Sequence, residues 1–308
     1  MLPDIYKTHQ DLKKKKITST EITQECLVVA KKSQNPIFIS LLEDYALLKA
    51  KEADARFQKG KAISYLDGIP FNLKDLFITK NIRTTASSMS LYNYIPAYEG
   101  YTSDHLQSAG AVLIGKVSCD QYGMGSSNEN TPFPVPHHPL DKTRVAGGSS
   151  GSTAVSIAEG SSFFGVGTDT GGSTRLPANF CGLVGFKPSY GRVSRYGQIA
   201  YASSLDQTSP FSRTVLDMAC IMQELTYKDP RDATQAPLGQ LKVVEELASL
   251  KSSFLKGKKI GFVPEFYAAC SSEIKTQLDK ALDIFKKQGA SIVDVSLPNA
   301  KYAISVYY

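Results

Sequence analysis

The chain has 308 residues, of which 42% are hydrophobic and 21% are charged, so its composition is that of an ordinary globular protein. This composition excludes a disordered, collagen-like or coiled-coil chain, and the length corresponds to about two average domains or one large α/β domain. A net charge of +6 spread over the chain does not by itself indicate a nucleic-acid-binding protein.

The first third of the chain, with an N-terminal helical segment over about residues 1–60, has the pattern of helices separated by short strands. Thr18 and Glu21 form a capping-box pattern before apolar residues at helical spacing. Composition predicts a helix over residues 42–57 and another over residues 104–109, the latter capped by Ser103. Residues 36–39 and 111–114 are short apolar runs with the character of strands. A third short apolar run, residues 69–73, leads directly to Lys74.

The middle of the chain, roughly residues 120–210, is crowded with Gly, Ser, Thr and Pro and carries few charges. Such a composition often marks a flexible linker, but here the small residues are interleaved with apolar residues that should be buried. We therefore predict tight turns in which the backbone packs closely on backbone or on a ligand. A helix over 151–159 and a strand over 163–166 separate two Gly/Ser turns and should bring both turns to one end of a sheet.

The last part of the chain returns to ordinary alternation of apolar and polar residues. Residues 260–263 and 291–295 are predicted to be strands, and between them Ser271 or Ser272 caps a helix that Gly289 ends. This order is a βαβ unit. The chain then stops directly after an apolar run without a polar tail, so we expect a fragment of a longer protein.

The cysteines and histidines indicate neither a disulfide framework nor a metal site. The five cysteines are an odd number without a CxxC pair, which fits a reducing compartment. The adjacent His137 and His138 have no Cys or carboxylate ligand close by, which favours a structural loop over metal binding. No stretch approaches the roughly 18 apolar residues of a membrane span, and the start of the chain lacks the apolar core of a signal peptide.

The two Gly/Ser turns carry the candidate nucleophiles. Residues 147–151 match G-x-S-x-G, the nucleophile elbow of α/β-hydrolases, but every histidine precedes Ser149, so the order Ser, acid, His of that fold fails. In the second turn Gly171 and Gly172 precede Ser173, and consecutive glycines let backbone N–H groups converge on one point, as an oxyanion hole requires. Ser173 would then be the nucleophile, although a Gly-Gly-Ser sequence alone is usually only a turn.

A serine nucleophile needs a base, and none of the histidines is well placed for that role. A lysine can act as the base if burial lowers its pKa enough to leave it neutral. Lys74 is a candidate because it directly follows the apolar run 69–73. A solvated lysine, or a simple ion pair with the adjacent Asp75, would explain the same residues, so this pattern alone does not single out Lys74.

Three segments together resemble the amidase signature family: Gly68-Ile-Pro-Phe-Asn-Leu-Lys74, Gly147-Gly-Ser-Ser-Gly151 and Thr168-Asp-Thr-Gly-Gly-Ser-Thr-Arg-Leu-Pro-Ala178. The resemblance implies an α/β amidase-signature fold with a central mixed β-sheet covered by helices on both faces. It implies a single amidase domain over residues 1–308 that is incomplete at its C-terminus. It also implies a catalytic triad and an oxyanion hole: Lys74 as the base, Ser149 after a cis peptide as the bridge, Ser173 as the acylated nucleophile, and the backbone of Thr170, Gly171 and Gly172 as the oxyanion hole.

Further segments are similar to one branch of this family, the A subunits of aspartyl/glutamyl-tRNA amidotransferases: Met124–Phe133, Lys187–Val193, Ala202–Gln207 and Lys301–Tyr308. This resemblance implies a glutaminase that releases ammonia from a γ-glutamyl ester on Ser173. The ammonia would pass to a B subunit, which amidates Glu-tRNA(Gln) or Asp-tRNA(Asn) with ATP and Mg²⁺, and a small C subunit would clamp the pair. The chain itself would need no metal or cofactor, and it would contact tRNA only through the B subunit.

The resemblance also leaves some points open. Tyr307 or Tyr308 matches a substrate-pocket tyrosine, while Ser152 and Leu176 depart from the usual Gly and Gln of the two turns. Two other functions remain: a stand-alone amidase of the same family acting on another small amide, and an inactive truncated scaffold. We expect a cytoplasmic protein, or a mitochondrial or plastid one in a eukaryote, with no membrane contact.

Overall fold

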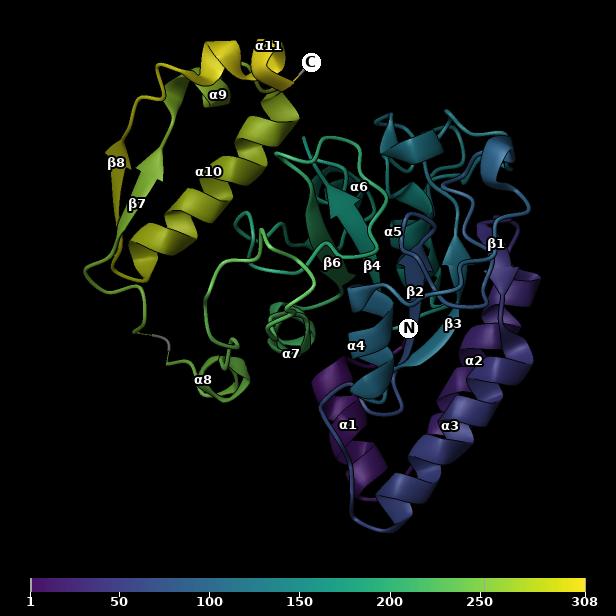
Figure 1. Ribbon diagram of the computed structural model, residues 1–308. Helices are drawn as coiled ribbons and strands as arrows, with labels where there is room; N and C mark the ends of the chain where they lie inside the picture. Colours follow the sequence, from purple (N-terminus) through teal and green to yellow (C-terminus); the bar gives the residue numbers. More distant parts are fainter. Residues whose placement is uncertain (1, 252, 308) are drawn as a thin grey trace. The chain divides into compact units, whose positions relative to one another are not determined.

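The computed structural model describes residues 2–251 and 253–307. The chain forms two compact units, the first ending at Val244 and the second beginning at Glu245, and each is described by itself (Figure 1). The expectation of one amidase domain over residues 1–308 stays a prediction. Among the described residues, no helix combines the length and the apolar character that crossing a membrane requires.

The first unit is built on a mixed six-stranded sheet in the order β1-β3-β2-β4-β6-β5 (Figure 1). β2 is parallel to both of its neighbours, β3 and β4, while β1, β6 and β5 run antiparallel to the strands they pair with. The strands are β1 (Phe38–Leu41), β2 (Pro70–Lys74), β3 (Val112–Val117), β4 (Phe164–Asp169), β5 (Val184–Gly185) and β6 (Gln207–Ser212). The predicted α/β class and mixed sheet are therefore confirmed.

Helices cover the sheet and bury its apolar residues. Ala46 and Ala50 of α3 pack with Ile114 of β3, whereas Asn72 of β2 donates a hydrogen bond to Ser156 of α5 at 2.6 Å. The helices of this unit are α1 (Ile5–Lys13), α2 (Ser19–Lys32), α3 (Glu43–Gln58), α4 (Tyr101–Ser108), α5 (Gly151–Glu159), α6 (Arg175–Phe180) and α7 (Val215–Leu225), and α8 (Val244–Ala248) begins where the unit ends.

Local sequence signals account for most of these elements. The capping box predicted at Thr18 and Glu21 is present at the start of α2, where both reciprocal hydrogen bonds form. The helix predicted over 151–159 is α5, and the residue that follows it, Gly160, takes the left-handed conformation. The cap predicted at Ser103 is wrong, because α4 already begins at Tyr101 and Ser103 lies inside its first turn.

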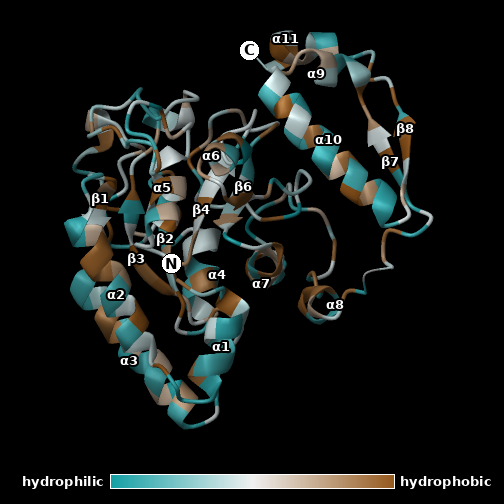
Figure 2. Cartoon of the chain, turned by 180° about the vertical axis from the view of Figure 1, so that it is seen from behind, coloured by the Kyte–Doolittle hydropathy of each residue, from teal (hydrophilic) through white to brown (hydrophobic). Residues whose placement is uncertain are grey.

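The second unit contains the predicted βαβ arrangement. Strands β7 (Lys259–Phe262) and β8 (Ser291–Asp294) are parallel, and α10 (Ser272–Lys287) connects them. The side chain of Ser271 caps α10 by accepting from the amide of Ile274, as predicted. Figure 2 shows apolar residues interspersed with hydrophilic ones along α10. The short helices α9 (Pro264–Ala268) and α11 (Ala303–Tyr307) complete the unit.

Candidate active site

Lys74 ends β2, the strand with parallel neighbours on both sides, and its side chain is fully buried. Its Nζ donates to the Oγ of Ser149 and to the Oγ1 of Thr168, each at 2.7 Å. Burial lowers the pKa of Lys74, and the more distant carboxylates of Asp120 and Asp169 only partly oppose this shift. A buried amine with a lowered pKa and hydroxyl partners can exist in the neutral form that a general base requires.

Asp75 is not the ion-pair partner of Lys74. Successive residues of a strand point to opposite faces, and the Asp75 carboxylate lies 3.1 Å from Nζ of Lys116 on β3. Lys116 is also fully buried and donates to the carbonyl of Phe77 at 2.6 Å. The alternative of a Lys74–Asp75 ion pair, open from the sequence, is therefore excluded.

The first Gly/Ser turn runs into α5 and places Ser149 against Lys74. The peptide bond between Gly148 and Ser149 is cis, as the resemblance implies. A Cβ on Gly148 would collide with the Asp120 carboxylate and lie 2.7 Å from the amide nitrogen of Asn128, so only glycine fits there. Asp120 Oδ2 accepts from that Asn128 amide at 2.9 Å, and the Asp120 amide donates to the carbonyl of Ser149 at 3.1 Å. Asp120 thus stabilises the first turn by connecting it to the loop of Asn128.

The second Gly/Ser turn is organised by Asp169, the last residue of β4. Its carboxylate accepts from the amides of Gly172 at 2.9 Å and Thr174 at 3.2 Å, and it forms an ion pair with Arg175 at 2.9 Å. Burial opposes ionisation of Asp169, but the hydrogen bonds from Arg175 prevail and hold its pKa below the usual value. Gly172 has φ +136°, which a residue with a Cβ rarely adopts.

The two turns meet, as the sequence predicts. The amide of Ser150 donates to the carbonyl of Ser173 at 3.1 Å, and the hydroxyl of Ser150 donates to the carbonyl of Thr168 at 3.3 Å. Ser173 is only 7% exposed, so it is almost entirely shielded from solvent. Within the part of the chain that the structure describes, the amides of Gly171 and Ser173 donate no hydrogen bond, whereas that of Gly172 is taken by Asp169.

The two free amides can supply an oxyanion hole, because an N–H without an internal acceptor is ready to bind a developing negative charge. The amide of Thr170 likewise donates no hydrogen bond among the described residues, and its hydroxyl donates to Asp206 at 2.6 Å. The roles expected for Lys74, Ser149, Ser173 and the oxyanion-hole backbone stay predictions, but the structure brings the two turns and the lysine together.

Several residues of the site were not assigned a role from the sequence. Asp120, Asp169 and Asp206 brace the turns, and Thr168 is the second acceptor of Lys74. The available signal was their charge, because Asp residues are few in a tract dominated by Gly, Ser, Thr and Pro. Buried carboxylates in such a tract need donors, and backbone amides of tight turns are the nearest ones.

The thiol of Cys119, near Lys74, does not compete with the serines as a nucleophile. Burial raises the pKa of Cys119 to about 11, so this cysteine stays protonated at neutral pH. Within the described residues, Cys26, Cys119, Cys181 and Cys270 form no disulfide. His138 accepts from the amides of Leu140 and Asp141, each at 3.2 Å, which agrees with the structural loop role favoured for the histidine pair.

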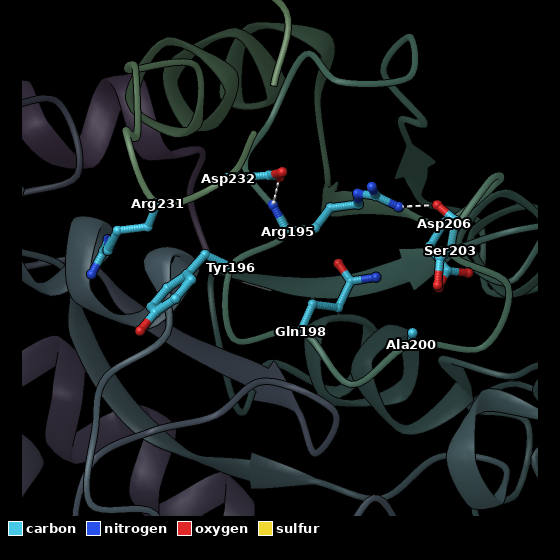
Figure 3. A pocket seen from close by; sticks show the side chains of 8 residues that line it. All are labelled: Arg195, Tyr196, Gln198, Ala200, Ser203, Asp206, Arg231 and Asp232. Carbon is cyan, nitrogen blue, oxygen red and sulfur yellow. Dashed lines mark hydrogen bonds between the residues drawn. The ribbon is translucent and has the colours of Figure 1, made fainter. Parts of the chain in front are cut away.

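A polar cavity of about 210 Å³ is lined in part by Asp206, whose carboxylate also accepts from the hydroxyl of Thr170 in the second turn (Figure 3). Its wall carries charges of both signs, those of Arg195, Arg231, Asp206 and Asp232, and the Asp232 carboxylate accepts from the amide of Arg195 at 2.8 Å. The remaining lining residues are Tyr196, Gln198, Ala200 and Ser203. Through Asp206 this cavity is one hydrogen bond from Thr170.

The resemblance implies that Tyr307 or Tyr308 lies near the substrate. Tyr307 is the last residue of α11 in the second unit, and Tyr308 lies outside the described residues. Their assignment stays a prediction. Of the two departures from the family pattern, Ser152 is buried, and its hydroxyl shares a 2.7 Å hydrogen bond with Ser118, while Leu176 is half-buried at the start of α6.

A buried lysine bonded to one serine, beside a second serine in a turn with free amides, is a serine–lysine arrangement suited to acyl transfer. The chain belongs to the amidase family, whose model matches residues 21–308.

Known relatives agree with this membership. The chain is 42% identical over 297 residues to a protein of Anaeromyxobacter dehalogenans named as the A subunit of glutamyl-tRNA(Gln) amidotransferase, covering 96% of this chain and 60% of the relative. The crystal structure of the protein of that name from Thermotoga maritima is 32% identical, with a TM-score of 0.81, covering 94% of this chain and 61% of that one. A peptide amidase from Stenotrophomonas maltophilia is 26% identical, with a TM-score of 0.86, covering 99% and 64%. The chain thus spans about three fifths of the length of these relatives.

Proposed function

We propose that this chain is the glutamine-hydrolysing A subunit of a tRNA-dependent amidotransferase, and that Ser173 forms its acyl-enzyme. The observation that carries the proposal is the contact between Nζ of buried Lys74 and Oγ of Ser149 at 2.7 Å. The similarity to relatives that carry the name of the glutamyl-tRNA(Gln) amidotransferase A subunit supports the choice of substrate.

In the proposed reaction, Ser173 Oγ attacks the side-chain amide carbon of glutamine. Its proton passes to the Ser149 hydroxyl, which gives its own proton to neutral Lys74. The amides of Gly171 and Ser173 stabilise the negative oxygen of the tetrahedral intermediate. The proton then returns to the leaving nitrogen, ammonia departs, and a γ-glutamyl ester remains on Ser173.

Water completes the cycle by attacking the ester, with Lys74 and Ser149 again accepting the proton, and glutamate is released. The side chains and amides named here perform every proton transfer and bind the developing charge, so the proposed glutaminase reaction calls for no metal or cofactor in this chain. We assign ATP and Mg²⁺ to the B subunit that would receive the ammonia and amidate the tRNA, with a C subunit holding the pair. A cytoplasmic location stays part of this proposal.

A stand-alone amidase is the second candidate, because the peptide amidase of Stenotrophomonas maltophilia has a similar fold at 26% identity. The two functions differ in substrate and in dependence on partners. Ammonia release from glutamine that rises when B and C subunits and tRNA are added supports the amidotransferase. Equal release with and without them, or turnover of other small amides in preference to glutamine, supports the stand-alone enzyme.

Covalent trapping tests the nucleophile directly. A diazo-ketone analogue of glutamine should add one equivalent to the chain, and peptide mass spectrometry should locate the adduct on Ser173. The Ser173→Ala variant should remain unlabelled, while Ser161→Ala, which removes a buried serine hydroxyl outside the site, should label normally. Labelling that survives Ser173→Ala would contradict the assignment. A chain that is folded but unlabelled and inactive would instead indicate the scaffold.

A further inference from the structure

Asp206 connects the second Gly/Ser turn to the polar cavity of Figure 3. Its Oδ1 accepts from the hydroxyl of Thr170 at 2.6 Å, and the residue is only 2% exposed. Given the proposed function, on which this inference rests, we propose that Asp206 is a positioning residue that holds the oxyanion-hole backbone in place through Thr170. It acts through that hydroxyl and does not touch the reacting atoms.

The carboxylate of Asp206 is itself fixed by its own loop. The amide of Tyr201 donates to Oδ2 at 2.9 Å, and the amide of Ala202 lies 3.1 Å from both oxygens. The amide of Asp206 donates back to the carbonyl of Ala202 at 2.9 Å. Because both oxygens are held by backbone amides, the carboxylate has little freedom to rotate and offers Thr170 a stationary acceptor.

The second turn needs such an anchor because no side chain at its centre restrains the backbone. Gly171 has no side chain, and glycine has the largest backbone freedom of any residue. Asp169 fixes the far end of the turn through the amides of Gly172 and Thr174. Asp206 fixes the near end through Thr170. The free amide of Gly171 lies between these two points, so both anchors together set the direction in which it points.

Asp232 lines the same cavity and provides a matched control (Figure 3). Its carboxylate also accepts from backbone amides, those of Arg195 and Thr234, each at 2.8 Å. Among the described residues, the hydrogen bonds of this carboxylate stay within the loops that carry Arg195 and Thr234, and none of them reaches the second turn. A change at Asp232 therefore loosens the cavity wall as a change at Asp206 does, without releasing Thr170.

The test measures how fast a fluorophosphonate labels Ser173 in the full chain, and separates the maximal rate from the half-saturating concentration. Removing one oxyanion donor costs about 10²–10³ in rate, so loosening one should cost roughly tenfold or more. Asp206→Asn and Thr170→Val should both lower the maximal rate by this factor with little change in half-saturation. Thr170→Ser keeps the hydroxyl and should label nearly as fast as the wild type.

The double variant Asp206→Asn with Thr170→Val should label no more slowly than the slower single variant, because the two residues act through one hydrogen bond. The maximal labelling rate of Asp232→Asn should stay within about twofold of the wild-type rate, because no oxyanion donor moves in this variant. The proposal would be overturned if the labelling rate of the double variant fell by the product of the two single factors. It would also be overturned if Asp206→Asn and Asp232→Asn lowered the labelling rate equally. Thr170→Val keeps the test valid should Asp206→Asn fold poorly, since it leaves the loop of Asp206 intact.

Amide hydrogen exchange over residues 170–175 gives a readout that does not depend on activity. Exchange should be faster in Asp206→Asn and Thr170→Val than in the wild type, and unchanged in Asp232→Asn. If wild-type Ser173 is not labelled at all, the proposed function fails. Hydrogen exchange alone then decides whether Asp206 anchors the second turn through Thr170. Unchanged exchange in Asp206→Asn and Thr170→Val would overturn it.

Discussion

Replacing Lys74 with Met tests whether the buried amine is neutral near physiological pH. Burial lowers the pKa of Lys74, so the native chain binds fewer protons at this site than the unfolded chain, whose lysine pKa is about 10.4. The wild type therefore has its full stability above about pH 10.4 and loses stability as the pH falls toward the native pKa. Each unit of lowered pKa corresponds to about 1.4 kcal/mol of lost stability.

The Met side chain carries no proton, so Lys74→Met escapes this loss but gives up two hydrogen bonds. The bonds to Ser149 and Thr168 contribute roughly 0.5–1.5 kcal/mol each and do not vary with pH in the same range. Relative to the wild type, the variant should become more stable by about 1.4 kcal/mol for each pH unit of decrease below about 10.4, until the native pKa is reached. The exposed Lys80 supplies the control, Lys80→Met.

The assay is urea unfolding of the three chains at several pH values between 7 and 10, with the difference in unfolding free energy plotted against pH. A constant difference between wild type and Lys74→Met would show that the buried lysine titrates as in the unfolded chain, and would refute the reasoning. The labelling rate of Ser173 gives a second check. It should rise with pH through the native pKa of Lys74 and then level off, and Lys74→Met should lower it by about 10²–10⁴.

Three further substitutions probe the packing around the site. Lys116→Met should destabilise the chain by about 3–5 kcal/mol in urea unfolding, because the buried Asp75 carboxylate loses its charged partner and keeps only the hydrogen bonds from Thr85, and adding Asp75→Leu should recover part of the loss. Gly172→Ala should cost about 1–3 kcal/mol through its φ of +136° alone, since a Cβ there meets no atom within 4 Å, and should slow labelling of Ser173. Gly148→Ala should reduce labelling more than Gly172→Ala, because its Cβ would collide with Asp120 and displace the first turn.

The sequence predicted the local elements and the meeting of the two turns. Residues 151–159 form α5 as expected, and its C-terminal end carries a clear signal in Gly160, which takes the left-handed conformation. The strand expected at 36–39 is β1 at Phe38–Leu41, two residues later, since pairing with β3 rather than the apolar run sets its limits. Boundaries that depend on tertiary contacts are the part that local patterns miss.

The long-range polar contacts could not be predicted from the sequence. Asp206 reaches Thr170 across 36 positions, and Asp120 reaches the carbonyl of Ser149 from a separate loop. Neither contact leaves a periodic or spacing signal, because each depends on how loops pack and not on a repeating local geometry. The motif around Ser173 marked the place, but only the fold shows which amides remain free there.

The two buried lysines show why residue type alone did not identify the base. Lys74 and Lys116 lie on neighbouring strands, both are fully buried, and burial lowers the pKa of both. At Lys116 the adjacent Asp75 carboxylate opposes that shift and favours the charged ammonium, which then serves as a structural ion pair.

At Lys74 the direct partners are the hydroxyls of Ser149 and Thr168, which can accept a hydrogen bond but do not balance a charge. The cost of burying an uncompensated ammonium therefore falls on Lys74 alone and favours its neutral form. Giving Lys74 a carboxylate partner should therefore give it the charged state of Lys116. Thr168→Asp should hold Lys74 charged and slow labelling of Ser173. Thr168→Val should leave the Lys74 amine neutral and slow labelling less.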